Sequence, residues 1–146
     1  MDVAPLRPPD LAARPFSLVA ERIMAASPAE LYHQCTQQFG LWFADPGSIL
    51  MRAAVNTPFF FTAGGGHPLY GRFLRLESER LVELTWVTDA TQGTETVVTL
   101  ELSAHGAGTA VLLTHAGFPN AATRDRHEKS WPNVLRQWDQ RSAAAV

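Results

Sequence analysis

The order of patterns along this 146-residue chain predicts an α+β domain in which a curved antiparallel sheet wraps around a helix. Three observations predict this fold class. A capping signal places a short helix just after the first strand pattern, strand-like segments follow from residue 49 to residue 116, and a helical pattern with tryptophans on one face comes last. Such a wrap can leave an apolar hollow that holds a small molecule.

Length and charge limit the possible functions. The chain fits one domain, which we expect to span residues 16–142 and to bury about two thirds of its unfolded surface. Twelve Lys and Arg stand against fourteen Asp and Glu, and the basic residues are scattered, so we expect no nucleic-acid partner. Cys35 is the one cysteine, which excludes an intramolecular disulfide and a cysteine-based zinc site.

The first fifteen residues predict a flexible arm. Four prolines remove backbone donors there, at Pro5, Pro8, Pro9 and Pro15. Charged residues interrupt any apolar run, so the segment resembles neither a signal peptide nor a membrane span. We therefore expect no membrane insertion and a cytoplasmic location.

The first strand and two short helices follow from local signals. Alternation of apolar and polar residues predicts a strand over residues 16–24. Ser27 and Glu30 then form a capping box with Pro28 at the first helical position, so a helix should begin at Pro28. Gly40 should end that helix, and a short second helix is expected around residues 41–43.

The middle of the chain predicts strands. They are expected at residues 49–55, 58–62, 68–77, 81–88, 94–103 and 109–116. The run Gly64-Gly65-Gly66 predicts a turn, because no helix with Lys-Ser or Lys-Thr follows to make it a phosphate-binding loop.

A long helix is predicted after Asn120, over residues 121–141. One face of it carries His127, Trp131, Leu135 and Trp138. Pro132 cannot donate a backbone hydrogen bond to residue 128, so we expect the helix to kink there or to restart with Ser130 as its cap.

Several short segments, in this order, resemble one known family. They are Glu21-Arg22-Ile23 with Ser27-Pro28-Ala29-Glu30, residues 80–86, Gly108-Thr109 with Leu112-Leu113-Thr114-His115, and His127 with Trp131. Together they resemble the heat-shock-protein ATPase activator homologue branch of the START, or birch-pollen-allergen-like, superfamily. The resemblance implies a helix-grip fold, in which a curved antiparallel sheet of six or seven strands holds a long carboxyl-terminal helix and two short helices follow strand one. The chain departs from the family at Ser130 and Pro132, where a glycine commonly precedes the tryptophan and no proline follows it.

The resemblance also implies a leading function, the binding of a small apolar molecule such as a lipid, a sterol or an aromatic compound, as carrier or sensor. One alternative is an aromatase- or cyclase-like enzyme in the same cavity, which needs Tyr70, Arg72 and His115 to converge. Another is a protein-interaction module, chaperone-associated or homodimeric, which needs an exposed apolar patch and a filled interior. Stimulation of a chaperone ATPase belongs, by the same resemblance, to larger proteins with a further amino-terminal domain.

Strand alternation predicts an inward side for two neighbouring strands, carrying Tyr70, Arg72, Leu74 and Leu76 on the first and Val82, Leu84 and Trp86 on the second. With the helix face, these sides predict which side chains line the cavity. The predicted lining is Phe59, Phe61, Tyr70, Arg72, Leu74, Trp86, His115, His127, Trp131, Leu135 and Trp138. Ordinary core packing is the competing interpretation for the aromatic residues and the histidines. Arg72, on an otherwise apolar side, should find a carboxylate, a polar ligand group or water at the strand end.

No metal site, cofactor or catalytic residue is predicted. The five histidines fall on separate elements. His33 and Cys35 would point about 200 degrees apart on a helix, which does not suit a shared metal ion. His115 and His127 could meet across the cavity mouth as acid and base, but a hydrogen-bonded packing role is the preferred interpretation of both.

Overall fold

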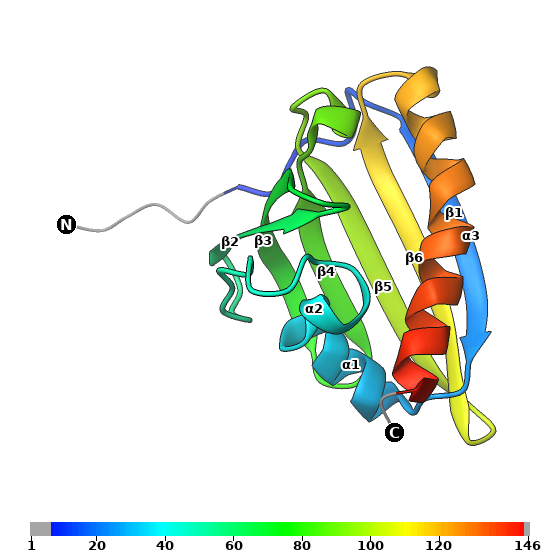
Figure 1. Ribbon diagram of the computed structural model, residues 1–146. Coiled ribbons are helices and arrows are strands. Elements are labelled where there is room, and N and C mark those ends of the chain that lie inside the picture. Colours follow the sequence, from blue (N-terminus) through cyan, green and yellow to red (C-terminus); the bar gives the residue numbers. More distant parts are fainter. Residues whose placement is uncertain (1–6, 145–146) are drawn as a thin grey trace.

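The computed structural model describes residues 7–144 and has the predicted α+β architecture (Figure 1). Its elements are β1 (Phe16–Met24), α1 (Pro28–Thr36), α2 (Phe39–Trp42), β2 (Pro58–Ala63), β3 (His67–Glu77), β4 (Leu81–Trp86), the 3-10 turn η1 (Asp89–Thr91), β5 (Thr96–His105), β6 (Gly108–Phe118) and α3 (Ala121–Ala144). The antiparallel sheet has the strand order β1-β6-β5-β4-β3-β2. It curves around α3, with α1 and α2 at one end, so the helix-grip expectation is confirmed.

The first and the last strand of the chain lie side by side at one edge of the sheet. β1 pairs with β6 along its whole length, with Leu18 opposite His115 and Ala20 opposite Leu113. These residues share the inner face, since opposite residues of an antiparallel pair point the same way. The predicted inward side of β4 is also confirmed, because Val82, Leu84 and Trp86 are all buried in the core. Most predicted strand boundaries lie within two residues of those observed.

The predicted inward side of β3 is wrong over its first half. Phe73 lies opposite Leu84 but Arg75 lies opposite Glu83, so one extra residue enters β3 between them. Such a bulge reverses which alternate residues face inward. As a result Leu69 and Phe73 are in the core, whereas Tyr70 is 54% exposed on the outer face.

The segment at residues 49–55 is not the strand that was predicted. It makes two isolated bridges, from Leu50 to Phe60 and from Val55 to Phe73. Between them the chain makes a tight turn, in which the Ala54 amide donates to the Arg52 carbonyl, and Asn56 follows with a positive φ of 63°. The backbone therefore crosses the sheet edge instead of running along it.

The last helix continues through Pro132 from Ala121 to Ala144, so the predicted restart at this residue does not occur. Pro132 lies on the exposed face, and so does Glu128, whose carbonyl loses its helical donor. Water can hydrate that carbonyl, which lowers the cost of the missing bond. Ser130 does not cap a new helix, because its hydroxyl donates to the Arg126 carbonyl within the helix.

A buried amide joins the three helices. The Gln34 side chain accepts a hydrogen bond from Trp138 Nε1 at 2.8 Å and donates to Ser142 Oγ at 3.0 Å, while its backbone carbonyl accepts from Trp42 Nε1. The rings of Trp42 and Trp138 stack with centroids 4.3 Å apart. Three hydrogen bonds thus pair polar groups of four residues within the core, which fixes the carboxyl-terminal half of α3 against α1 and α2.

The described part of the predicted arm lies against the sheet. Arg14 donates to the carbonyl oxygens of Gly117, at 2.8 Å, and Glu95, at 2.7 Å. Leu11 packs against Gly117 so closely that a side chain at that glycine would overlap it. Residues 1–6 of the arm lie outside the described residues, and the mobility of the arm stays a prediction.

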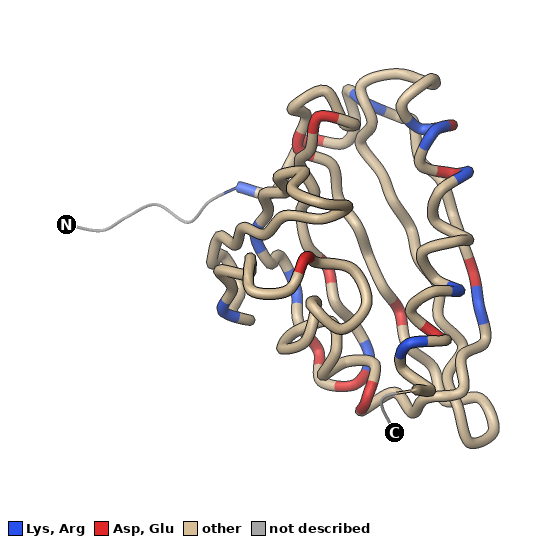
Figure 2. The backbone as a smooth tube through the Cα atoms, viewed as in Figure 1, with Lys and Arg blue, Asp and Glu red and all other residues tan. Residues whose placement is uncertain are grey.

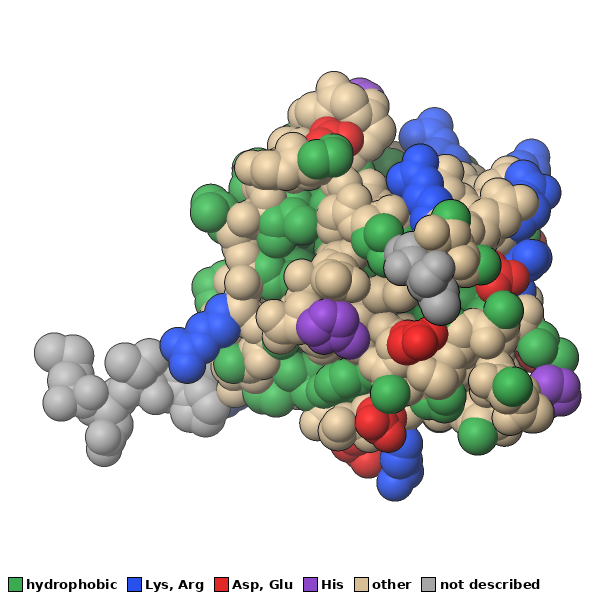
Figure 3. Space-filling model, turned by 60° about the horizontal axis from the view of Figure 1, so that its bottom comes forward, with side chains coloured by type: hydrophobic (Ala, Val, Ile, Leu, Met, Phe, Trp, Pro, Cys, Tyr) green, Lys and Arg blue, Asp and Glu red, His purple; other side chains and the backbone are tan. Residues whose placement is uncertain are grey.

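Charged and apolar groups are mixed over the surface. Basic and acidic positions are interspersed along the helices and strands (Figure 2). Hydrophobic side chains reach the surface in areas separated by polar groups (Figure 3). Within residues 7–144, no helix combines the length and the hydropathy that crossing a bilayer requires.

Gly71 is a position in the sheet with no room for an added side chain. A Cβ atom there would overlap the Thr85 carbonyl oxygen and the Phe59 ring. We expect Gly71→Ala to lower the free energy of unfolding by about 1–3 kcal/mol, because the backbone and a core ring must both move. Urea denaturation would measure this. The control Gly40→Ala, in α2 with its nearest contact at 3.4 Å, should be close to neutral, and equal effects of the two changes would contradict the argument.

Candidate functional site

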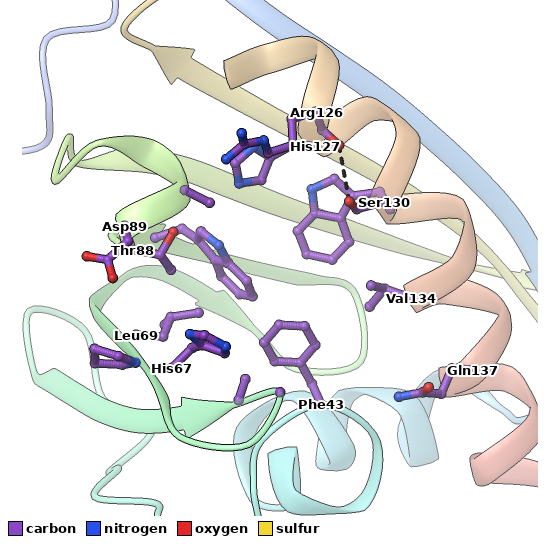
Figure 4. A pocket seen from close by; sticks show the side chains of 16 residues that line it. Phe43, His67, Leu69, Thr88, Asp89, Arg126, His127, Ser130, Val134 and Gln137 are labelled. Carbon is purple, nitrogen blue, oxygen red and sulfur yellow. Dashed lines mark hydrogen bonds between the residues drawn. The ribbon is translucent and has the colours of Figure 1, made fainter. Parts of the chain in front are cut away.

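A pocket of about 640 Å³ lies between the sheet and α3, at the end of the sheet that carries η1 (Figure 4). Its walls come from the residue after α2, the β2–β3 turn, the end of β4, η1 and α3. The walls are mostly apolar, formed by Phe43, Leu69, Trp86, Trp131 and Val134. Polar side chains occur around them, namely His67, Thr88, Asp89, Arg126, His127, Ser130 and Gln137.

The pocket exists because α3 packs over β1 and β6, at one edge of the sheet, and not over the strands near the other edge. α3 packs against β1, β6 and α2, and the β2–β3 side of the sheet stands opposite it across the pocket. The turn on that side is held by Asp45, whose carboxylate accepts from the Thr62 hydroxyl and from the amides of Gly65 and Gly66. These bonds, with that of Thr62 the strongest influence, lower the pKa of Asp45. The triple glycine is therefore a turn, as predicted, and an anchored one.

A hydrogen-bonded chain passes from α3 into the sheet through His115. Trp131 Nε1 donates to His115 Nδ1 at 3.0 Å. The neutral imidazole must then carry its proton on Nε2, which lies 2.7 Å from Thr96 Oγ1. Thr96 in turn donates to the Trp86 carbonyl oxygen at 2.6 Å. Both ring nitrogens of His115 are thus occupied, and the residue lies behind the pocket wall as a structural link.

His127 holds a different position, on the pocket wall itself. It is 9% exposed, and its Nδ1 lies 2.8 Å from the Thr123 carbonyl, which can only accept. Nδ1 therefore carries the proton and Nε2 keeps a free lone pair. Burial lowers the pKa of His127 below its ordinary value of 6.5, with a smaller contribution from Arg126. Burial, and then His127, lower the pKa of His115 well below the same value.

Three predicted site residues line the pocket: Trp86, His127 and Trp131. Phe59, Phe61, Leu135 and Trp138 are packed in the core instead. Leu74 is half-buried at the bulge of β3 and, with Tyr70 and Arg72, lies outside the pocket lining.

Sequence reasoning missed Phe43, His67, Leu69 and Val134. Val134 could have been found, since it lies three residues after Trp131 on a neighbouring stripe of the helix. Leu69 was hidden by the bulge in β3, and His67 and Phe43 reach the pocket through turns whose paths the sequence does not specify.

Tyr70, Arg72 and His115 do not form the constellation that an aromatase-like site was expected to need. Arg72 is buried, and it pairs with Glu95 through two contacts of 3.1 Å and with the backbone carbonyl of Arg7. It has found the carboxylate that its burial demands. Tyr70 points away, with its ring against Phe60. Cys35 is fully buried, as expected of a small core residue, and burial raises the pKa of its thiol.

Comparisons with known proteins give a family and a fold. The family model described as "Activator of Hsp90 ATPase homolog 1-like protein" matches residues 25–142. No curated protein matches the chain.

Among solved structures, a Mesorhizobium loti protein is similar with a TM-score of 0.76 and 23% identity, covering 89% of this chain and 98% of that one. The Aha1 dimer from Colwellia psychrerythraea is similar with a TM-score of 0.67 and 19% identity, covering 84% and 92%. DynU16, from the dynemicin biosynthetic locus, has a TM-score of 0.74 and 12% identity, covering 86% and 46%.

The two buried histidines should make stability depend on pH. Their lowered pKa values mean that the unfolded chain takes up protons below about pH 6.5 while the folded one resists protonation. The free energy of unfolding should hold its full value above pH 6.5 and decrease as the pH falls, by at most about 1.4 kcal/mol per pH unit for each histidine.

Urea denaturation between pH 7.5 and pH 5 would measure this dependence. His127→Gln should make the decrease shallower, because one of the two histidines is removed. His105→Gln, at the exposed end of β5, should leave the decrease as it is in the unaltered protein. An equally steep decrease in His127→Gln would contradict the assignment.

Proposed function

We propose that this chain, which belongs to the activator of Hsp90 ATPase homolog 1-like family, binds a small and largely apolar molecule in the pocket between its sheet and α3. The observation that carries the proposal is the pocket itself. Its volume of about 640 Å³ falls within the usual range for small-molecule sites. Aromatic side chains form its walls, with a few polar groups among them, which is the usual composition of such sites.

The aromatic walls favour a flat ligand over a flexible one. Trp86 and Trp131 are neighbours, with ring centroids 5.3 Å apart at an angle of 54°. Phe43 extends the same surface, 5.1 Å from Trp86. Rings arranged in this way offer faces and edges to another aromatic system. Of the lipids, sterols and aromatic compounds that the family resemblance implies, the aromatic compounds suit these walls best.

The role that fits is that of a carrier or sensor. Among residues 7–144, no pair of side chains in the pocket shows a nucleophile hydrogen-bonded to a base. DynU16, the relative from a biosynthetic locus, is consistent with a small-molecule role for this fold. Native mass spectrometry of freshly purified protein, beside a solvent-extracted sample, tests the proposal directly. A bound mass of a few hundred daltons, lost on extraction, is the expected result.

A pocket-filling substitution gives a second test. Val134 lines the pocket and Asn133, its neighbour on α3, is exposed outside it. Val134→Phe should weaken binding of the fluorescent probe 1-anilinonaphthalene-8-sulfonate by about 1–3 kcal/mol, because the added ring occupies ligand space. Fluorescence titration measures this change. Asn133→Phe, which adds a ring outside the pocket, should retain the original affinity, and equal affinity in both variants would count against the pocket.

A second candidate function is association with another copy of the chain. An apolar row crosses the outer face of the β2–β3 region, where Leu50, Phe60, Tyr70 and Val87 lie opposite one another in register. Leu50 is 71% exposed and Tyr70 is 54% exposed. The similar Aha1 structure from Colwellia psychrerythraea is a dimer, which makes self-association the form of contact to test first.

Sedimentation velocity would test this association. The unaltered protein should form dimers at micromolar concentration, and Tyr70→Lys should shift it to monomers by placing a charge within the apolar row. Val19→Lys, at a similarly exposed residue on β1, should leave the dimer intact. A protein that stays monomeric up to the highest concentration tested would exclude this candidate.

A further inference from the structure

The four tryptophans differ in what their indole N–H groups contact. Trp42 donates to the Gln34 carbonyl, Trp131 to His115 Nδ1 and Trp138 to Gln34 Oε1. Trp86 lines the pocket and is 5% exposed, yet its Nε1 has no acceptor among residues 7–144. Among the described residues, Arg72 Nη1 is the one fully buried side-chain nitrogen or oxygen without a hydrogen-bond partner. Trp86 Nε1 also lacks a partner, so it must keep some accessible surface. A donor therefore stands unpaired at an apolar wall.

An unpaired acceptor lines the same pocket, on α3. His127 is nine-tenths buried, and its proton is committed to the Thr123 carbonyl through Nδ1. Nε2 has no donor within the described part of the chain. Figure 4 shows His127 at the α3 side of the pocket, above the Thr88 and Asp89 side of the opposite wall. In apolar surroundings each unpaired polar group costs free energy that a partner would recover.

We infer that the ligand is an uncharged aromatic compound with a hydroxyl group, a phenol in the simplest case, whose hydroxyl donates to His127 Nε2 and which also offers an acceptor to Trp86 Nε1. This inference rests on the proposed function, because it describes the occupant of the same pocket. A phenolic oxygen can do both, as it donates one hydrogen bond and accepts others. A second oxygen elsewhere on the ring would serve equally for Trp86.

The charges at the pocket support an uncharged ligand. Arg126 and Asp89 stand on opposite walls, so neither sign of charge is favoured over the other. The hydroxyl of Ser130 donates to the Arg126 carbonyl and the amide of Gln137 donates to the Trp42 carbonyl. Those two donors are already used, whereas Trp86 Nε1 and His127 Nε2 have no partner within residues 7–144. His67, at the start of β3, is the other pocket imidazole without a partner among the same residues.

Three probes of nearly equal shape separate these contacts. 2-Naphthol can donate and accept, 2-methoxynaphthalene can accept only, and naphthalene can do neither. Isothermal titration calorimetry at pH 7.5 should show that 2-naphthol binds about three- to tenfold more tightly than 2-methoxynaphthalene, the usual effect of one hydrogen bond. 2-Methoxynaphthalene should in turn bind more tightly than naphthalene, because it still accepts from Trp86.

Two variants assign the preference to His127. In His127→Phe the difference between 2-naphthol and 2-methoxynaphthalene should disappear, while the affinity for naphthalene is retained. His105→Phe, the same change at the exposed end of β5 and outside the pocket lining, should keep the difference. Circular dichroism would show that each variant is folded. If His127→Phe does not fold, the ranking of the three probes on the unaltered protein decides the question.

The possible failures are distinct. Equal affinity for 2-naphthol and 2-methoxynaphthalene would overturn the inference and leave the proposed function standing, and so would a difference that survives in His127→Phe. If none of the three probes binds and native mass spectrometry finds no bound mass, the proposed function itself fails.

Discussion

The position of the amino-terminal half of α3 depends on one buried imidazole. His115 receives a hydrogen bond from Trp131 on the helix and passes one through Thr96 to the Trp86 carbonyl, so a helix and three strands meet at a single ring. Each member is satisfied only while the others are in place, which makes the contact sensitive to small shifts of the helix. The same chain of bonds fixes Trp86 and Trp131, which are the two tryptophans of the pocket wall. The shape of the pocket is therefore a consequence of core packing.

A pocket can persist beside a dense core because two neighbouring stripes of side chains on α3 have different surroundings. One stripe packs in the core and the other lines the pocket. Leu135 and Trp138 enter the core, where Gln34 pairs with the Trp138 indole and holds the end of the helix. Ser130, Val134 and Gln137 follow the neighbouring stripe and line the pocket. The pocket wall opposite is held open by Asp45 through the glycine turn. Since both walls are fixed by buried or charge-assisted bonds, the space does not depend on a ligand to exist.

The sequence predicted the fold well and the site only in part. Capping at Ser27, alternation along β1 and β4 and the tryptophan face of α3 are local signals, and each was confirmed. The side of β3 was wrong because a bulge at residue 74 is set by pairing with β4, which no local pattern shows. Gln34 and Thr96 gave no signal, because their hydrogen-bond partners Trp138 and His115 lie far from them in the sequence. The helix continued through Pro132 because that residue faces water, which depends on how α3 packs.

Trp86 links stability and recognition in one residue. Its carbonyl accepts the last bond of the His115 chain, while its indole N–H is left for the pocket. The other three tryptophans use their indole N–H groups in hydrogen bonds within the fold, so core packing explains these residues without a ligand. A core that needed only filling could place phenylalanine at position 86. A pocket-lining indole without a protein acceptor among residues 7–144, on the same pocket as a histidine with a free acceptor, is better explained as part of a surface that recognises a ligand. A ligand bound there would also stabilise the folded chain, because the unfolded chain has no such surface.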